Sequence, residues 1–223
     1  MIVIIGATKG IGRVIAHRFS NRDELLVLSG RDTDSLTSLY KEIKVLKDNV
    51  FIEPIDISKP ESIDKFIEKL SCYNEPLEGL INTAASFYRG TFFDESQKSI
   101  EELLATTFAG PVLLISKVLK HLKLAVPCDI INITSVGAAT NLDSSKSSAF
   151  HITTKAAIHL FGVITGRELA SSGVRFCNIA PGTFARNGRT GIPENSIADT
   201  VEFIFNLPPE MYIESIVMRP TGK

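Results

Sequence analysis

The chain has 223 residues, of which 44% are hydrophobic and 22% are charged, a composition typical of one globular domain with a full hydrophobic core. Its 24 basic and 25 acidic residues nearly cancel, which argues against attraction to nucleic acid or an anionic membrane through overall charge. The three cysteines form no CxxC pair and the histidines form no set with metal-ligand spacing, so we expect no disulfide framework and no metal.

The N-terminal MIVIIGATKG shows no signal-peptide pattern, and we expect no apolar run of membrane-spanning length. The sequence therefore predicts a cytoplasmic protein with a single domain over 1–223. Its expected partners are small molecules or other protein chains.

Short apolar runs rich in β-branched residues alternate with longer segments of helical period. In chain order, the expected strands cover 2–5, 25–29, 50–55, 77–82, 128–134, 174–179 and 214–218. The expected helices cover 11–20, 33–47, 60–71, 97–123, 149–171 and 195–206. This alternation predicts an α/β fold, a Rossmann-type doubly wound parallel sheet of about seven strands with helices on both faces.

The first strand runs into GATKGIG, with glycines at 6, 10 and 12, and a helix follows. Such a turn brings backbone N–H groups and the positive end of a helix dipole to one point, where a pyrophosphate can bind. Gly6 permits the tight turn, Gly10 lets the phosphate approach, and Gly12 allows close packing of the helix on the strand. A purely structural turn is the alternative, which the position at the first strand disfavours.

The spacing GxxxGxG resembles that of the short-chain dehydrogenase/reductase family, and the resemblance extends to the C-terminus. It implies an oxidoreductase with a nicotinamide dinucleotide cofactor. INTAA resembles the family's NNAG, with Thr83 and Ala85 as departures, and IAPGTF resembles its nicotinamide-side loop. The cofactor contacts implied by the resemblance are Gly6, Thr8, Lys9, Gly10, Ile11, Gly12, Asp56, Ile57, Asn82, Ala84, Lys155, Pro181, Gly182 and Phe184.

The end of the second strand, SGRD, favours NADP(H) over NAD(H). Gly30 stands where a carboxylate would hold the ribose 2′-hydroxyl, and Arg31 follows it. A guanidinium is a good bidentate partner for a 2′-phosphate, and Lys9 adds a second cation. The alternative is that Arg31 is a solvated residue opening a helix.

Carbonyl reduction needs a proton donor, a hydrogen-bond donor that orients the carbonyl, and a cation that holds the ribose. In the resembling family, tyrosine, serine and lysine fill these roles, and an asparagine supports a water relay. Ser135 and Lys155 match the serine and the lysine, whereas His151 occupies the tyrosine position and Thr107 the asparagine position. Ser135, His151, Lys155 and Thr107 are therefore the candidate catalytic residues.

The role of His151 stays open. The positive charge of Lys155 one helical turn away lowers the pKa of the imidazole. A neutral imidazole is a poor acid, although it can act as a base in alcohol oxidation or orient a substrate. A packed residue without a special role is the alternative, and Ser135, Thr153 and Tyr88 are other possible proton donors.

Two hypotheses about function follow. The first is an NADP(H)-dependent oxidoreductase acting on a small alcohol or carbonyl compound, and the second is a catalytically impaired NADP(H)-binding sensor or partner protein. The resemblance also implies a homodimer or homotetramer, formed through the helices near 97–123 and 149–171. Arg186 and Arg189 follow the sixth strand and are candidates to accept an anionic substrate group.

Overall fold

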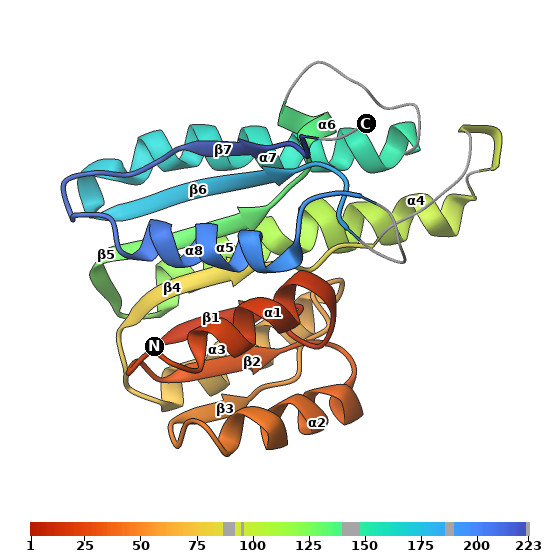
Figure 1. Ribbon diagram of the computed structural model, residues 1–223. Coiled ribbons are helices and arrows are strands. Elements are labelled where there is room, and N and C mark those ends of the chain that lie inside the picture. Colours follow the sequence, from red (N-terminus) through yellow and green to blue (C-terminus); the bar gives the residue numbers. More distant parts are fainter. Residues whose placement is uncertain (87–91, 95, 140–147, 186–189, 222–223) are drawn as a thin grey trace.

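The structure is a computed structural model that describes residues 1–86, 92–94, 96–139, 148–185 and 190–221 (Figure 1). Its strands form one seven-stranded parallel sheet in the order β3-β2-β1-β4-β5-β6-β7. They are β1 (Ile2–Ile5), β2 (Leu26–Ser29), β3 (Val50–Ile52), β4 (Leu77–Asn82), β5 (Leu124–Ile133), β6 (Val174–Pro181) and β7 (Ser215–Met218). The chain order reverses between β1 and β4, which is where such sheets bind ligands.

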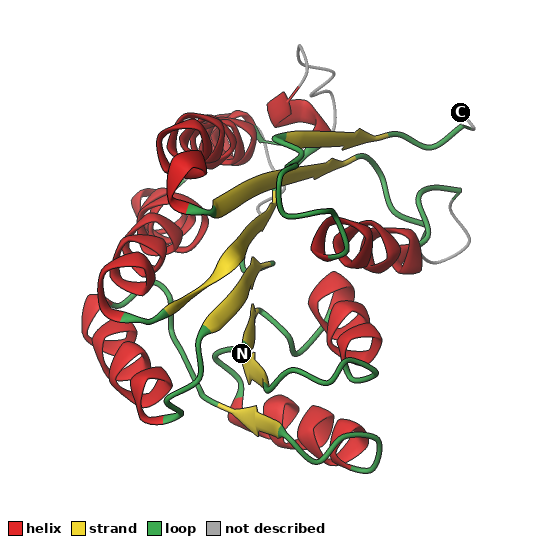
Figure 2. Cartoon of the chain, turned by 90° about the vertical axis from the view of Figure 1, so that its left-hand side faces the viewer, coloured by secondary structure: helices red, strands yellow, loops and turns green. Residues whose placement is uncertain are grey.

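Helices cover both faces of the sheet (Figure 2), so the predicted fold class is confirmed. One face carries α1 (Gly10–Phe19), α2 (Thr33–Lys44) and α8 (Glu194–Phe205). The other carries α3 (Pro60–Cys72), α5 (Gly110–His121) and α7 (Ala149–Leu169). The shorter elements are α4 (Gln97–Leu104), α6 (Val136–Ala139), the π-helical turn Ala105–Ala109 and 3₁₀ turns at Phe92–Asp94 and Ala170–Ser172.

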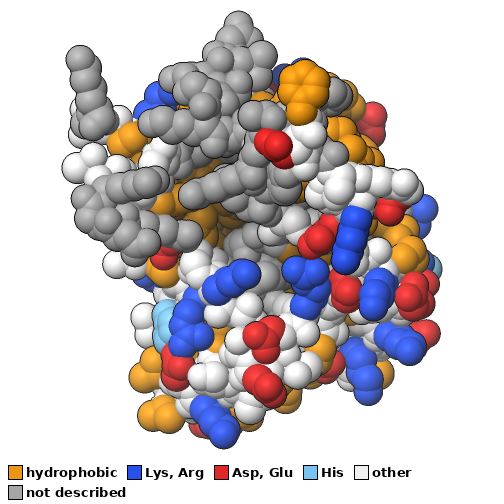
Figure 3. Space-filling view, turned by 90° about the vertical axis from the view of Figure 1, so that its right-hand side faces the viewer, with side chains coloured by type: hydrophobic (Ala, Val, Ile, Leu, Met, Phe, Trp, Pro, Cys, Tyr) orange, Lys and Arg blue, Asp and Glu red, His pale blue; other side chains and the backbone are white. Residues whose placement is uncertain are grey.

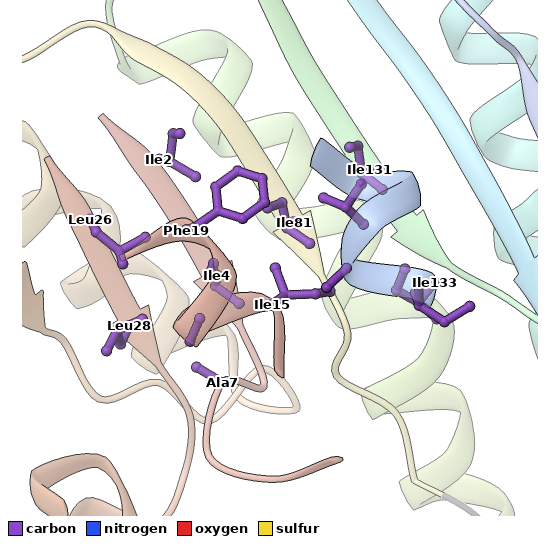
Figure 4. Close-up of a cluster of buried hydrophobic side chains, with 14 of the residues drawn as sticks. Ile2, Ile4, Ala7, Ile15, Phe19, Leu26, Leu28, Ile81, Ile131 and Ile133 are labelled. Atoms are coloured by element: carbon purple, nitrogen blue, oxygen red, sulfur yellow. The ribbon is translucent and has the colours of Figure 1, made fainter. Parts of the chain in front are cut away.

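The apolar strands supply both halves of the core because their side chains alternate between the two faces. In β1, Ile2 and Ile4 belong to one buried cluster, whereas Val3 and Ile5 belong to the other. Figure 4 shows the first cluster, where Phe19 of α1 lies near the side chains of the central strands. This packing fixes α1, and with it the turn that precedes α1.

The helix expected over 97–123 is interrupted at its middle. Gly110 donates its backbone N–H to the carbonyl of Ala105, five residues back, which makes a π-helical turn. Pro111 follows, and its ring would clash with the carbonyl four residues earlier in a regular α-helix. The wider turn accommodates the proline, and a Cβ on Gly110 would lie only 2.0 Å from the carbonyl oxygen of Ile57.

By length and hydropathy, the continuous segment Gln97–His121 has the properties of a membrane span, so the expectation that no apolar run reaches that length is wrong. Buried helices of a protein core have the same properties. Here Leu114, Ile115 and Val118 of α5 are buried in the second core cluster. Of the apolar window in this segment, 44% is buried within the fold.

Two further boundaries differ from the expected ones. The fifth strand begins at Leu124, before Pro127, because a register shift between Leu77 and Gly79 of β4 lets pairing continue past the proline. The short helix α6 begins directly after Ser135. A four-residue helix is too short to show a helical period in sequence.

Candidate active site

A cleft of about 1840 Å³ lies at the carboxyl ends of the strands. Figure 3 faces this end of the molecule, and Lys and Arg side chains gather on the lower half of the view. Most of the expected site residues line it: Gly6, Thr8, Lys9, Gly10, Ile11, Gly12, Arg31, Ile57, Ala84, Ser135, His151, Lys155, Pro181, Gly182 and Phe184. The fold thus brings the glycine-rich turn and the candidate catalytic residues to one cavity.

The turn after β1 requires its glycines. Gly6 and Gly10 have φ angles of +82° and +55°, a conformation that residues with a Cβ rarely adopt. Gly12 has ordinary dihedral angles, but a Cβ there would lie 2.2 Å from the carbonyl oxygen of Gly6. The glycines therefore allow a tight turn, and the backbone of this turn lines the cleft.

Thr83 stabilises this turn from β4. Its hydroxyl donates to the carbonyl oxygens of Ile5 at 2.8 Å and Gly6 at 3.2 Å. In the sequence, Thr83 stands out only as a departure from the family pattern, and no motif assigns it this role. Nothing in the sequence places the end of β4 against the end of β1, so this contact becomes visible only with the strand order.

The N-terminus of α1 suits an anion. No side chain caps it, and its first turn contains no acidic residue. By contrast, Asp32 caps α2, because its carboxylate accepts hydrogen bonds from the backbone N–H groups of Asp34 and Ser35. The N–H groups of α1 that lack a side-chain cap lie at the cleft with Lys9 beside them, which is the arrangement that binds a phosphate.

Arg31 lines the cleft next to this turn. Its Nη1 lies 3.9 Å from Oε1 of Glu102 on α4, an ion pair between residues 71 positions apart that no local sequence pattern predicts. The neighbouring carboxylate of Asp32 is occupied at the start of α2, and hydrogen bonds from the Ser35 backbone and hydroxyl lower its pKa. Arg31 is thus the cation placed to meet a ligand anion on this side.

His151 and Lys155 enter the cleft from the first turns of α7 and are only 6% and 7% exposed. Ser148 begins the helix and accepts a hydrogen bond from the backbone N–H of His151 at 3.1 Å. The Lys155 ammonium donates to the carbonyl oxygen of Ile133, at the end of β5, at 2.7 Å. Ser135 follows two residues later, so all three candidates lie at the junction of β5 and α7.

Burial governs the protonation of this pair. It lowers the pKa of His151 to about 4, with a smaller contribution from the positive charge of Lys155 and an opposing one from a hydrogen bond with the backbone of Ser86. Burial also lowers the pKa of Lys155 to about 8. Near neutral pH, His151 is therefore uncharged and Lys155 is mostly protonated.

A third residue of the same helix stripe, His159, ties α7 to the sheet. Its Nδ1 lies 3.1 Å from Oγ1 of Thr134 and its Nε2 lies 3.4 Å from Oγ of Ser215. Thr134 already donates to the carbonyl of Ile179, so the fitting tautomer has the proton on Nδ1 and accepts from Ser215. No motif in the sequence assigns a role to His159.

Three expected site residues do not line the cleft. Thr107 is only 2% exposed within the π-helical turn, and Thr106 lines the cleft in its place. Asn82 bonds to Asn132 and to the backbone of Ala84. Asp56 accepts hydrogen bonds from the backbone and hydroxyl of Ser58.

The alternative proton donors Thr153 and Ser135 differ in their position relative to the cleft. Thr153 is exposed and donates to the carbonyls of Ala149 and Phe150, away from the cleft lining. Ser135 lines the cleft. Tyr88, together with the expected anion-binding residues Arg186 and Arg189, lies outside the described residues.

The opposite wall of the cleft is the turn after β6. Gly182 donates its N–H to the carbonyl of Met218 at 2.8 Å, which joins this turn to the end of β7. A Cβ on Gly182 would lie 3.3 Å from that oxygen. Arg219 follows β7 and also lines the cleft, although no motif in the sequence marks it as a site residue.

The fold is a doubly wound sheet with a glycine-rich turn at its switch point, and a serine, a histidine and a lysine lie beside that turn. Together these features are typical of nicotinamide-dependent oxidoreductases. Residues 1–196 match the sequence model described as short chain dehydrogenase. The chain belongs to that family.

Curated relatives and solved structures agree with this assignment. An uncharacterized oxidoreductase of Staphylococcus aureus is 26% identical, with 98% of this chain and 96% of the relative covered. An alcohol dehydrogenase from Thermococcus sibiricus, complexed with 5-hydroxy-NADP, has the same fold with a TM-score of 0.86 at 23% identity, covering 99% and 96% of the chains. A serine dehydrogenase complexed with NADP⁺ gives a TM-score of 0.85 at 23% identity, covering 99% and 95%.

Proposed function

We propose that the protein is an NADP(H)-dependent oxidoreductase that interconverts a small alcohol and its carbonyl compound. The observation that carries the proposal is the convergence of the open α1 N-terminus, Arg31, Ser135 and Lys155 on one cleft. A nicotinamide bound there supplies or accepts the hydride at the substrate carbon. Both of the structural neighbours described above are complexes with an NADP ligand, which supports the choice of cofactor.

Residues of the chain then bind the cofactor and orient the substrate. The backbone of the glycine-rich turn and the first turn of α1 hold the pyrophosphate, with Lys9 nearby. Arg31 binds the 2′-phosphate, because its side chain reaches the cleft and Asp32 is bonded to the start of α2. Ser135 donates a hydrogen bond to the substrate oxygen.

The proton for reduction comes from Lys155 in this proposal. With a pKa of about 4, His151 carries a proton in about one molecule in a thousand at pH 7, and a neutral imidazole gives up its N–H proton only at very high pH. The Lys155 ammonium has a pKa of about 8, close to the range in which a general acid works best. His151 orients the substrate oxygen as a neutral group.

The second candidate is an NADP(H)-binding sensor or partner protein without turnover. The low pKa of His151 favours this candidate, because the residue at the usual proton donor position is neutral and almost wholly buried. The two candidates share the cofactor and differ only in the chemical step.

One experiment separates them. Binding of NADPH is followed through its fluorescence, and then its absorbance is followed with a panel of small aldehydes, ketones and keto acids. The enzyme is expected to bind NADPH and to oxidise it with at least one carbonyl compound. Binding without turnover across the panel supports the sensor, and absence of NADPH binding contradicts both candidates.

We also propose that the protein is a cytoplasmic homo-oligomer. Leu160 and Ile164 lie one turn apart on α7 and are 58% and 49% exposed, although long apolar side chains on a monomer surface are usually scattered. An interface through α7 would bury both. Analytical ultracentrifugation tests this proposal, since a Leu160→Glu variant should shift the protein towards monomer.

A further inference from the structure

Two side chains from opposite halves of the sheet meet across the mouth of the cleft. Arg31 follows β2, whereas Glu102 lies on α4, which comes after β4 in the chain. Their charged groups lie 3.9 Å apart and remain 56% and 48% exposed. Glu102 is held towards Arg31 by Ser86, whose hydroxyl donates to the same Oε1 atom at 3.0 Å.

The other carboxylates near Arg31 have partners of their own. Asp32 accepts three hydrogen bonds at the start of α2. Burial acts to raise the pKa of Asp56, but hydrogen bonds from Ser58 and the charges of Lys59 and Arg31 keep it below its ordinary value. Glu102 is the carboxylate among these three that forms an ion pair with Arg31 within 4.0 Å.

We propose that Glu102 sets how strongly the cleft prefers a 2′-phosphorylated dinucleotide over the unphosphorylated one. This inference rests on the proposed function, in which Arg31 receives the 2′-phosphate. A phosphate dianion that pairs with Arg31 must replace the Glu102 carboxylate or share the guanidinium with it. In either case two anions compete for one cation, and the competition weakens NADP(H) binding.

The same contact leaves NAD(H) binding almost unchanged. A ribose 2′-hydroxyl carries no charge, so it neither displaces Glu102 from Arg31 nor is repelled by it. Glu102 therefore lowers the affinity for one cofactor selectively. Because the pair is exposed, the effect is a few-fold in affinity and decreases as salt is raised.

Ser86 extends the contact towards the catalytic residues. Its hydroxyl holds Glu102, and its backbone hydrogen-bonds His151. Removal of the hydroxyl by Ser86→Ala should loosen Glu102 and reproduce part of the effect of its neutralisation. Ser86 thus acts as a positioning residue for Glu102.

The test compares the dissociation constants of NADPH and NADH by fluorescence titration at low salt. Glu102→Gln keeps the shape of the side chain and is expected to tighten NADPH binding about threefold to fivefold, with NADH changed by less than about twofold. The matched control is Glu101→Gln. Glu101 is the adjacent residue of α4, accepts a hydrogen bond from Gln97 and forms no ion pair with Arg31.

In the Arg31→Ala background, Glu102→Gln should lose its selective effect on NADPH, as expected for two groups that act through one contact. The inference is overturned if Glu102→Gln changes the two cofactors equally, if Glu101→Gln reproduces its effect, or if the effect persists without Arg31. Failure of the unmodified protein to bind NADPH would overturn the proposed function and this inference together. Binding of NADPH with no response to Glu102→Gln overturns this inference alone.

Discussion

His151 and Lys155 lie one turn apart on α7, and both side chains line the cleft although each is less than a tenth exposed. Burial lowers both pKa values, to about 4 for the imidazole and about 8 for the ammonium. The residue at the tyrosine position is therefore neutral near pH 7, while the lysine is the acid of the pair. Both groups thus keep the order of pKa values that they have in water, with each value lowered by burial.

Replacement of His151 by tyrosine should raise the rate of carbonyl reduction. A phenol beside a cation is a better proton donor than a neutral imidazole, and general acid catalysis contributes about a hundredfold or more where the geometry fits. The measurement is the kcat of NADPH oxidation with the best substrate of the panel. His151→Phe is the control, since it fills the same space without a proton, and an equal rate in both variants would show that the phenol supplies none.

Removal of the Arg31 side chain should weaken the binding of NADPH more than the binding of NADH. Arg31→Ala is expected to weaken NADPH binding about tenfold to a hundredfold, because a charge-assisted hydrogen bond contributes about 1.5–3 kcal/mol. NADH binding should change by less than about threefold. Fluorescence titration of both cofactors measures this, and equal weakening would refute the assignment of Arg31 to the 2′-phosphate.

Lys155 should reduce stability near neutral pH. The fall of its pKa from 10.5 to about 8 corresponds to about 3 kcal/mol for holding the charge in the fold, of which the bond to Ile133 restores about 1 kcal/mol in the protein. Lys155→Met should therefore raise the free energy of unfolding at pH 7 by about 2 kcal/mol. The same variant should no longer oxidise NADPH with a carbonyl substrate.

The difference in stability between Lys155→Met and the unmodified protein should depend on pH. The unfolded lysine binds more protons than the folded one between pH 8 and 10.5, so the stability of the unmodified protein rises over this range. The advantage of Lys155→Met should shrink accordingly. Urea unfolding at pH 7 and pH 9.5 tests this, with Lys120→Met on the exposed end of α5 as the control. An advantage that does not depend on pH would contradict a buried charge at position 155.

His159 should contribute to stability through its two contacts. His159→Leu removes the links to Thr134 and Ser215 and should lower the free energy of unfolding by about 1–2 kcal/mol. His159→Gln keeps a donor and an acceptor and should recover part of the loss. Chemical denaturation measures both variants, with His121→Leu at the exposed end of α5 as the comparison; indistinguishable stabilities would show that the contacts contribute little.

Much of the fold could be predicted because apolar strands and helical segments have clear periods. The expected first and fourth strands coincide with β1 and β4. Ser135, His151 and Lys155 could be found because each occupies a place in a spaced motif. The π-helical turn could not be predicted from periodicity, since it depends on how Pro111 and Gly110 fit against Ile57.

Thr83, Glu102 and His159 were missed for a common reason. Each acts on a residue that is distant in the sequence: Thr83 on Gly6, Glu102 on Arg31, and His159 on Ser215. No local pattern marks such a residue, because its role depends on which strand ends and helices are neighbours. Thr107 shows the converse, since its motif position was matched but its side chain is buried in the helix turn.

Under the proposed function, the N-terminus of α1, which has no side-chain cap, links the stability of the chain to the supply of its dinucleotide. A cofactor that completes the first turn of α1 binds the folded state alone, so a hundredfold excess over its dissociation constant adds about 2.7 kcal/mol. Without it, the folded population decreases and proteases have more unfolded chain to cut. Dinucleotide concentration would then regulate the abundance of this protein in the cell through thermodynamic linkage, with no need for a dedicated regulatory site.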